Sequence, residues 1–345
     1  MSRIVFALSL LLLLGASCIQ LQVTREQGGV FVSTDNGAHW ASASEILAVG
    51  GARASLAAVN ITDLVADPQD QKTLYALFPG GGFAVTHDAA RSWEAVRTVP
   101  TSATVAALGV NPHNVCEVYI AAGAGVLKTD NCLRSWSTLY IDPRTEEVVL
   151  SLAIVPERPE QVYAGLSTGE LISSTDGGQT WTATARFSSG VRTIVVEPKS
   201  GVHLEVATTR NGVYGSVDSG ASWAPMNGNL EHFAQTTHVL ELVREPATAG
   251  GLLALTPLGI FSWQQEKRTW QTLHLIPTPG SAEITAIAVS PKDSSELSYT
   301  ASGVLYASSD GGARWRSLPL PTSKAVSKIL IDSTDPNRMY IATTR

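Results

Sequence analysis

The segment Ser174-Thr175-Asp176-Gly177-Gly178-Gln179-Thr180-Trp181 decides the fold, because its pattern SxDxGxxW recurs along the chain. Residues 33–40, 216–223 and 308–315 repeat the pattern in full. Residues 86–93 repeat it with alanine at the glycine position, and residues 130–136 repeat it with one extra residue. A seventh copy survives at residues 262–270 without its aspartate. We call each copy a box.

The tryptophans that close the boxes set the period of the chain. Successive ones lie 42 to 53 residues apart, which is the repeat length of a propeller blade. Each period also holds alternating strands, such as residues 193–198 and 204–208, and a glycine turn leads into a third strand before the box. The tryptophan begins the fourth. Four antiparallel strands per period, without helical periodicity after the N-terminal segment, predict an all-β propeller of seven blades.

The box residues are predicted to hold the scaffold together. A turn aspartate accepts bonds from nearby backbone N–H groups, glycine supplies a positive φ, and tryptophan buries a large apolar face. The alternative, that the aspartates are catalytic acids or metal ligands, is disfavoured because one acid recurs in separate blades in the same turn. The predicted structural residues are Asp35, Trp40, Asp88, Trp93, Asp130, Trp136, Asp176, Trp181, Asp218, Trp223, Trp270, Asp310 and Trp315.

The two ends of the sequence predict how the ring closes. Residues 326–345 resemble the first two strands of a blade, and residues 28–44 resemble the last two. Joining them in one blade removes the exposed strand edges of an open ring. The predicted blades are residues 62–99, 105–140, 149–185, 191–227, 237–275 and 284–320, plus 326–345 combined with 28–44. Residues 18–345 are therefore expected to form a single domain.

With these motifs, the chain resembles the Asp-box (bacterial neuraminidase repeat) propellers over residues 28–345. Sialidases, xyloglucanase-type glycosidases, sortilin-type receptors and photosystem II assembly factors resemble one another in carrying this box. The box therefore specifies the scaffold far more than the function.

Residues 1–17 have the pattern of an export signal. Arg3 precedes an apolar run that ends at Leu14, and this run is shorter than the roughly 20 residues of a membrane-spanning helix. The sequence Leu14-Gly15-Ala16-Ser17-Cys18 resembles a bacterial lipobox, although glycine stands where a leucine-like residue is usual. We expect a lipid on Cys18 and a place in the bacterial cell envelope, with ordinary signal cleavage as the alternative.

The two other cysteines, Cys116 and Cys132, lie symmetrically about a glycine turn at residues 122–125. Their sulfurs would then face each other across the ends of one hairpin, and export to an oxidising compartment permits a bridge. Two buried free thiols are the alternative.

Composition excludes several classes of function. The net charge of −6 without a long basic run argues against nucleic-acid and anionic-lipid partners. The sequence holds no GxSxG, phosphate-loop, HExxH or CxxC motif, and its seven histidines are scattered, so no cofactor and no metal is predicted.

Glycoside hydrolysis needs two carboxyl groups beside the scissile bond. The candidates are Asp142, Glu146, Glu147 and Glu231, for which a solvated loop face is the favoured interpretation. The resemblance to sialidases implies three arginines that clamp a carboxylate, for which Arg144, Arg192 and Arg210 are available. Sialidases also have an arginine-containing segment near their start, which does not precede Asp35 here. Xyloglucanase-type enzymes generally use two propellers, whereas this sequence has residues for one.

The favoured interpretation is a non-catalytic scaffold at the envelope that binds a protein or glycan partner, similar to the assembly-factor branch. A carbohydrate-active hydrolase is the alternative. The irregular connections lie on the face opposite the boxes, and variable loops on a rigid scaffold usually collect binding residues. The predicted binding residues there are Tyr140, Asp142, Arg144, Glu147, Arg192, Arg210, Glu231 and His232, with ordinary solvated loops as the alternative.

Overall fold

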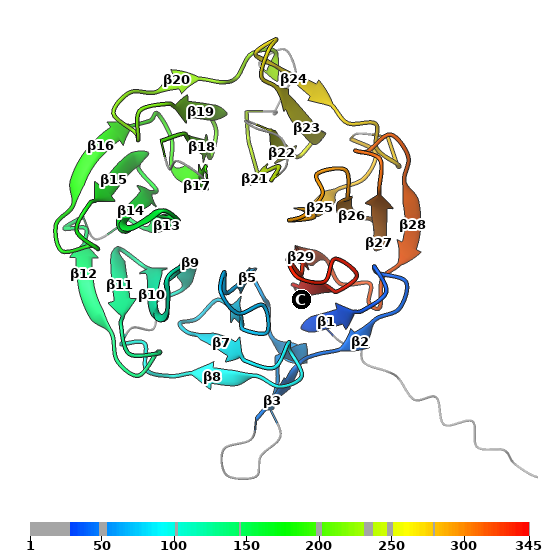
Figure 1. The fold of residues 1–345 in the computed structure, drawn as a ribbon, viewed down its shortest axis with the longest axis horizontal. Helices are drawn as coiled ribbons and strands as arrows, with labels where there is room; N and C mark the ends of the chain where they lie inside the picture. Colours follow the sequence, from blue (N-terminus) through cyan, green and yellow to red (C-terminus); the bar gives the residue numbers. More distant parts are fainter. Residues whose placement is uncertain are drawn as a thin grey trace, which may run out of the picture.

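The computed structural model describes residues 28–47, 54–100, 103–144, 146–197, 202–230, 237–246, 251–278 and 280–344. Within these ranges, seven four-stranded antiparallel sheets stand around a central axis (Figure 1). The predicted seven-bladed β-propeller is confirmed. Among the described residues, no helix has the length and apolarity needed to cross a membrane.

We name the blades A to G in the order of the ring. Blade A consists of β29 (Val326–Ile331), β30 (Met339–Thr343), β1 (Val30–Ser33) and β2 (Ala41–Ser42). Blade B consists of β5 (Asp63–Ala66), β6 (Leu74–Leu77), β7 (Phe83–Thr86) and β8 (Glu94–Val96). Blade C consists of β9 (Val105–Asn111), β10 (Asn114–Ala122), β11 (Gly125–Thr129) and β12 (Ser137–Ile141). Blade D consists of β13 (Val149–Val155), β14 (Arg158–Leu166), β15 (Glu170–Ser174) and β16 (Thr182–Arg186).

The remaining blades follow the same plan. Blade E consists of β17 (Val191–Val196), β18 (Leu204–Thr208), β19 (Val213–Ser216) and β20 (Ala224–Pro225). Blade F consists of β21 (Glu241–Arg244), β22 (Leu252–Thr256), β23 (Gly259–Gln264) and β24 (Thr269–Thr272). Blade G consists of β25 (Ile284–Val289), β26 (Leu297–Ala301), β27 (Val304–Ser308) and β28 (Arg316–Pro319). Outside the blades lie a short hairpin of β3 (Glu45–Ile46) and β4 (Ala54–Ser55), and the 3-10 turn η1 (Leu56–Ala58).

The ring closes in blade A, as the half blades at the two ends predict. β1 pairs antiparallel with β30, with Val30 opposite Ala342 and Ser33 opposite Met339. The backbone N–H of Thr343 also donates to the carbonyl of Gly29 at 3.0 Å. The first strand of each blade lies nearest the axis and the fourth forms the rim (Figure 1).

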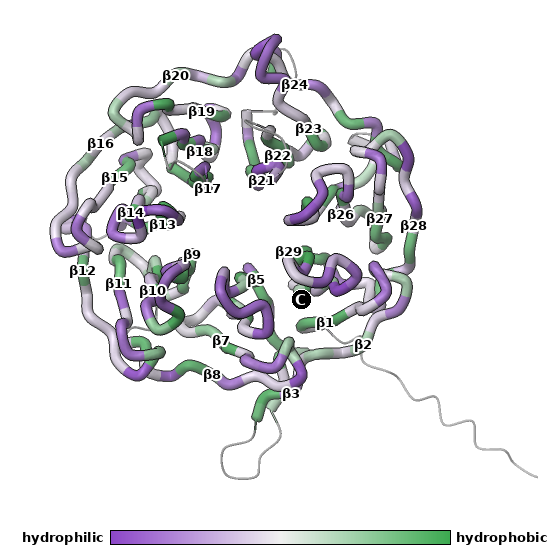
Figure 2. The backbone as a smooth tube through the Cα atoms, viewed as in Figure 1, coloured by the Kyte–Doolittle hydropathy of each residue, from purple (hydrophilic) through white to green (hydrophobic). Residues whose placement is uncertain are grey.

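Apolar side chains between neighbouring blades form the core. Tyr119 and Val126 of blade C, for instance, pack in one buried cluster with Val162 and Ile172 of blade D. Apolar stretches lie along the strands, whereas many turns are hydrophilic (Figure 2). The alternation of strand residues thus places one blade face against the next.

Each complete box forms the same hydrogen-bonded turn. In blade D, the Ser174 hydroxyl donates to Asp176 Oδ1 at 2.7 Å, and the N–H groups of Gly178 and Thr180 donate to Ser174 Oγ at 2.8 Å and Asp176 Oδ1 at 2.9 Å. The hydroxyl and N–H of Thr180 lower the pKa of Asp176 to about 2. The boxes headed by Ser33, Thr86, Ser216 and Ser308 have the same bonds.

Blade C requires a correction, because Asn131 and not Asp130 takes the aspartate position. The Thr129 hydroxyl and the Ser135 N–H both donate to Asn131 Oδ1 at 3.0 Å. The copy begins at Thr129, just as the box of blade B begins at Thr86, so it contains no extra residue. An amide oxygen accepts the same bonds as a carboxylate oxygen, which is why the turn survives the change.

Blade F has no box turn at all. Trp263 pairs directly with Trp270 across β23 and β24, and only residues 265–268 connect the strands. Trp270 nevertheless keeps one contact of a box tryptophan. Its Nε1 donates to the Met226 carbonyl of blade E at 2.6 Å, as Trp315 Nε1 donates to the His274 carbonyl of the preceding blade at 2.6 Å.

A disulfide joins Cys116 and Cys132 in blade C. The Cys132 N–H also donates to the Cys116 carbonyl at 3.3 Å. The same backbone bond recurs in other blades, where the box turn meets the turn between the first two strands, as from Gly177 to Glu160 at 2.8 Å. The disulfide therefore lies where the blade plan already brings two backbone segments together.

Candidate functional site

The propeller has two different faces. The bond from Cys132 to Cys116 shows that the box turn meets the turn between the first and second strands, and we call this side the box face. On the opposite side, the Asp142 N–H donates to the Ala124 carbonyl at 2.9 Å, so the connection between blades meets the turn after the second strand. We call this side the loop face. The predicted binding residues that the structure describes belong to it.

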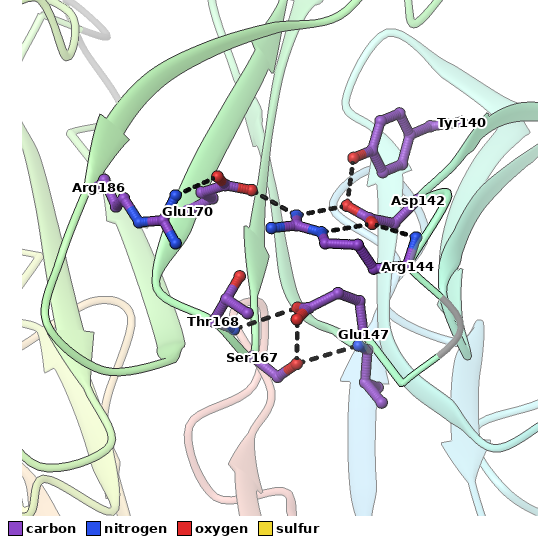
Figure 3. A network of polar contacts seen from close by, with 9 residues as sticks. Tyr140, Asp142, Arg144, Glu147, Ser167, Thr168, Glu170 and Arg186 are labelled. Atoms are coloured by element: carbon purple, nitrogen blue, oxygen red, sulfur yellow. Dashed lines mark hydrogen bonds and ion pairs between the residues drawn. The ribbon is translucent and has the colours of Figure 1, made fainter.

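Four of these residues join blades C and D near the rim (Figure 3). Asp142 has a side chain only 1% exposed, and it accepts bonds from Arg144 Nε at 2.8 Å and Arg144 Nη2 at 2.7 Å. The Tyr140 hydroxyl also donates to this carboxylate, reaching Asp142 Oδ2 at 2.8 Å. The bonds from Arg144 hold the pKa of Asp142 well below its usual range, while burial and Asp142 raise the pKa of Tyr140 to about 12.

The same network continues into blade D. Arg144 also pairs with Glu170, which in turn pairs with Arg186 at 2.9 Å. Glu147 is buried, and its Oε2 accepts bonds from the Ser167 hydroxyl at 3.0 Å and the Thr168 N–H at 3.2 Å. These carboxylates are occupied in fixing one blade against the next.

The loop-face mouth of the channel holds a separate charged cluster. Lys328 of β29 lies 2.5 Å from a Glu241 oxygen of β21 and 3.6 Å from an Asp63 oxygen of β5. Burial lowers the pKa of Lys328, but the charges of Glu241 and Asp63 outweigh it, so the pKa is raised. Because blades A and F are not neighbours, the bond from Lys328 to Glu241 crosses the channel.

The channel cluster separates two cavities. One, of about 440 Å³, opens toward the loop face and is lined by Asp63, Arg192, Glu241 and Lys328. The other, of about 460 Å³, lies toward the box face and shares Glu241 and Lys328 in its lining. The two cavities also share Thr193, Ile194 and Leu242, so Glu241 and Lys328 belong to the stretch of channel wall where the cavities meet.

Of the six predicted binding residues that the structure describes, Arg192 is the one that lines the loop-face cavity. Arg192 lies there and its Nε donates to the Leu240 carbonyl at 2.9 Å. Arg210 is exposed on the turn between β18 and β19. Tyr140 lies on the rim strand β12, and Asp142, Arg144 and Glu147 lie in the connection that leads from β12 to β13. Glu231 and His232 lie outside the described residues.

Sequence reasoning missed Asp63, Glu241 and Lys328. Each is a charged residue within the first strand of its period, surrounded by apolar residues. A first strand next to an axial channel has one row of side chains facing the channel, so this pattern was the available signal. Across the described ranges, no group of three or more His, Cys, Asp or Glu side chains is arranged to hold a metal ion.

Comparison with known proteins shows the fold. No protein-family model and no curated protein sequence matches the chain. The GH74 xyloglucanase of Xanthomonas campestris matches at 19% identity over 83% of this chain and 51% of its own, with a TM-score of 0.67. A YCF48 structure with a bound D1 peptide matches at 16% identity over 83% of this chain and 93% of its own, with a TM-score of 0.65. YCF48 from Cyanidioschyzon merolae matches at 14% identity over 83% and 95%, with a TM-score of 0.64.

This chain thus spans about half the length of the xyloglucanase. At these identities the likeness defines a class by fold, and the chain is a seven-bladed β-propeller. The xyloglucanase and YCF48 both have this fold. The fold alone therefore does not decide the function of this chain, which has to be argued from its site.

Proposed function

We propose that this chain is a non-catalytic scaffold of the Asp-box type, exported to the bacterial cell envelope, whose loop face binds a protein or glycan partner. The observation that carries the proposal is the condition of the loop-face carboxylates. Asp142 is held by Arg144 and Tyr140, and Glu147 is held by Ser167 and Thr168. Groups bound in this way fix the scaffold and are not free to serve a substrate.

Their electrostatics also oppose hydrolysis. A glycosidase needs one carboxyl group with a raised pKa to protonate the leaving oxygen. The pKa of Asp142 shifts in the other direction because of Arg144. In the channel, the carboxylates of Asp63 and Glu241 are both paired with the ammonium of Lys328.

A protein partner is supported by two observations. Arg192 and Arg210 are exposed on the loop face, and arginine is common where proteins bind each other. The YCF48 structure that shares this fold contains a bound peptide. We infer that the exposed arginines contact the partner. The network of Asp142, Arg144 and Glu170, which we call the rim network, keeps blades C and D in a fixed relation.

Site-specific crosslinking tests the proposal. A photoreactive residue at Arg210 should capture a discrete envelope protein or glycan, and the same residue at Gln179 on the box face is the matched control. Equal capture from both positions, or capture from Gln179 alone, would overturn the assignment of the loop face.

The alternative function is a glycoside hydrolase, which the shared fold with GH74 enzymes favours. Turnover of sialosides and β-glucans, xyloglucan included, is measured for the wild type and for Asp142→Asn, Glu147→Gln, Glu231→Gln and Glu241→Gln. We expect no turnover above background. Turnover that one of these isosteric substitutions abolishes would establish the enzyme instead.

The envelope location depends on Cys18, which lies outside the described residues. We propose that Cys18 carries the lipid, so the mature protein should partition with membranes and Cys18→Ser should release it. Mass spectrometry that finds an unmodified mature chain beginning elsewhere would contradict this.

A further inference from the structure

The interface between blades E and F lacks an element that fills other interfaces. Elsewhere, the box turn of one blade packs closely against the preceding blade. A Cβ atom at Gly178 of blade D would lie 2.3 Å from Leu139 of blade C, and one at Gly37 of blade A would lie 2.5 Å from Leu305 of blade G. Blade F has only the connection of residues 265–268 in place of a box turn.

Strand register shows what replaces this contact. In blade C, Tyr119 lies opposite Lys128, which lies opposite Ser137. In blade E, Glu205 lies opposite Gly215, which lies opposite Ala224. Glu205 and Gly215 therefore occupy the places of Tyr119 and Lys128, and Met226, two residues after Ala224, occupies the place of Leu139.

In blade C these places hold the next box turn. The Tyr119 hydroxyl donates to the Gly177 carbonyl at 3.1 Å, and Gly178 lies against Leu139. In blade E, Glu205, Gly215 and Met226 instead line a cavity of about 440 Å³. This volume is within the range of about 300–1,000 Å³ that ligand sites usually have.

The walls of the cavity differ from those of a filled interface. Trp223 and Trp263 line it together with Met226, so much of the surface is apolar. The side chain of Glu205 is only 10% exposed and is paired with Arg244 of β21. Where a tyrosine hydroxyl donates to a turn carbonyl, an ionised carboxylate only accepts, so an occupant that bonds to this form of Glu205 must bring a donor.

We propose that this cavity, the E–F cavity, binds a turn of a protein partner that directs a backbone N–H toward Glu205 and packs between Trp223 and Trp263. The same positions in blade C enclose the glycine-containing turn of residues 177–178, so the E–F cavity lies where a turn of this kind fits. The proposal concerns the box face and does not depend on the loop-face function.

Two peptides test the E–F cavity directly. The probe is the capped octapeptide with the sequence of residues 174–181, and the control is its scrambled version. NMR shifts of labelled Trp223 and Trp263 side chains should saturate with the probe and not with the control.

Two substitutions define the site. Gly215→Trp introduces a side chain much bulkier than the Lys128 that accompanies the box turn in blade C, and it should weaken probe binding by about tenfold or more by occupying the cavity. Glu205→Gln keeps the shape and should weaken binding by a smaller factor, since one charge-assisted bond becomes neutral. Gln179→Trp adds the same side chain elsewhere on the box face and should leave binding unchanged.

A graft provides an independent test. Replacing residues 263–269 with the sequence of residues 175–180 rebuilds a complete box in blade F and also removes Trp263. The rebuilt turn should fill the cavity, so the probe should no longer shift the remaining reporter, Trp223. Equal binding of probe and scrambled peptide, no saturable shift, or unchanged binding by Gly215→Trp would overturn the proposal. A β-glucan oligosaccharide that shifts the two tryptophans when the peptide does not would also overturn it. The Arg192→Ala and Arg210→Ala variant should bind the probe normally, so failure here leaves the loop-face proposal standing.

Discussion

The box face and the loop face use the same kinds of side chain for different purposes. On the box face, each aspartate accepts bonds within its own turn, as Asp176 does from Thr180 and Ser174. On the loop face, carboxylates reach across blades, as Glu170 does to Arg144 and Glu241 does to Lys328. The hydrogen bonds that repeat from box to box therefore hold each turn in place. The contacts of the loop face differ from blade to blade.

The difference predicts where damage to the fold will be largest. Deleting residues 327–345 removes nearly all of β29 and β30, which supply half of blade A. The truncated chain should lose the whole cooperative transition, because two sheet edges and two interblade surfaces become exposed. Circular dichroism melting of both chains measures this. A truncated chain that melts like the full one would show that closure in blade A is unnecessary.

A box tryptophan should be the next most costly change. Trp93 is fully buried, and its Nε1 donates to the Ala43 carbonyl at 2.7 Å. Trp93→Ala should lower the free energy of unfolding by about 3–5 kcal/mol, through lost burial and the resulting cavity. Urea unfolding is the measurement, and Arg210→Ala on the loop face is the control that should change it little. Equal losses from the two variants would erase the distinction between the faces.

The disulfide on the box face is expected to contribute somewhat less. Cys116 and Cys132 are 16 residues apart, and closing a loop of that length is worth about 3 kcal/mol in the chain-entropy model. Cys132→Ser should therefore lower the free energy of unfolding by about that amount, and reductant should destabilise the wild type similarly. Thiol labelling of denatured exported protein gives the direct check. Two labelled cysteines besides Cys18 would contradict the bridge.

The smallest predicted effect concerns the link from one blade to the next box. The Tyr163 hydroxyl donates to the Ser219 carbonyl at 2.8 Å, as Tyr119 does to Gly177. Tyr163→Phe and Tyr119→Phe should each cost about 1 kcal/mol of unfolding free energy, because a partly buried carbonyl loses its donor. Unchanged stability in both variants would mean that the box turns are held by packing alone.

Sequence reasoning predicted the scaffold closely because its signals are local. The predicted blade of residues 149–185 is observed as β13 to β16, which end at Arg186. The box of blade C was misread by one residue, since Asp130 precedes the amide that takes its role. Tryptophan spacing, turn residues and half blades all act within one period, so they can be read along the chain.

The site was less predictable because it depends on separate blades. Lys328, Glu241 and Asp63 come from three blades, and only the closed ring brings them together. The rim network formed around Asp142 because the connection after β12 folds back on blade D, which no local pattern indicates. The E–F cavity arises from a missing turn, and its shape is evident only beside the filled interfaces.

Quantitative partner capture tests the central claim, that the loop face is the working surface, most directly. Full-length protein is immobilised, and capture from native envelopes is compared between a loop-face set, Arg192→Ala with Arg210→Ala, and a box-face set, Asn36→Gly with Gln179→Ala. Glycine is used at Asn36 because its φ is 55°, where alanine would be strained. We expect the loop-face set to lose the partner and the box-face set to retain it, with both sets folded. If the box-face set loses the partner while the loop-face set retains it, the working surface has been assigned to the wrong side of the propeller.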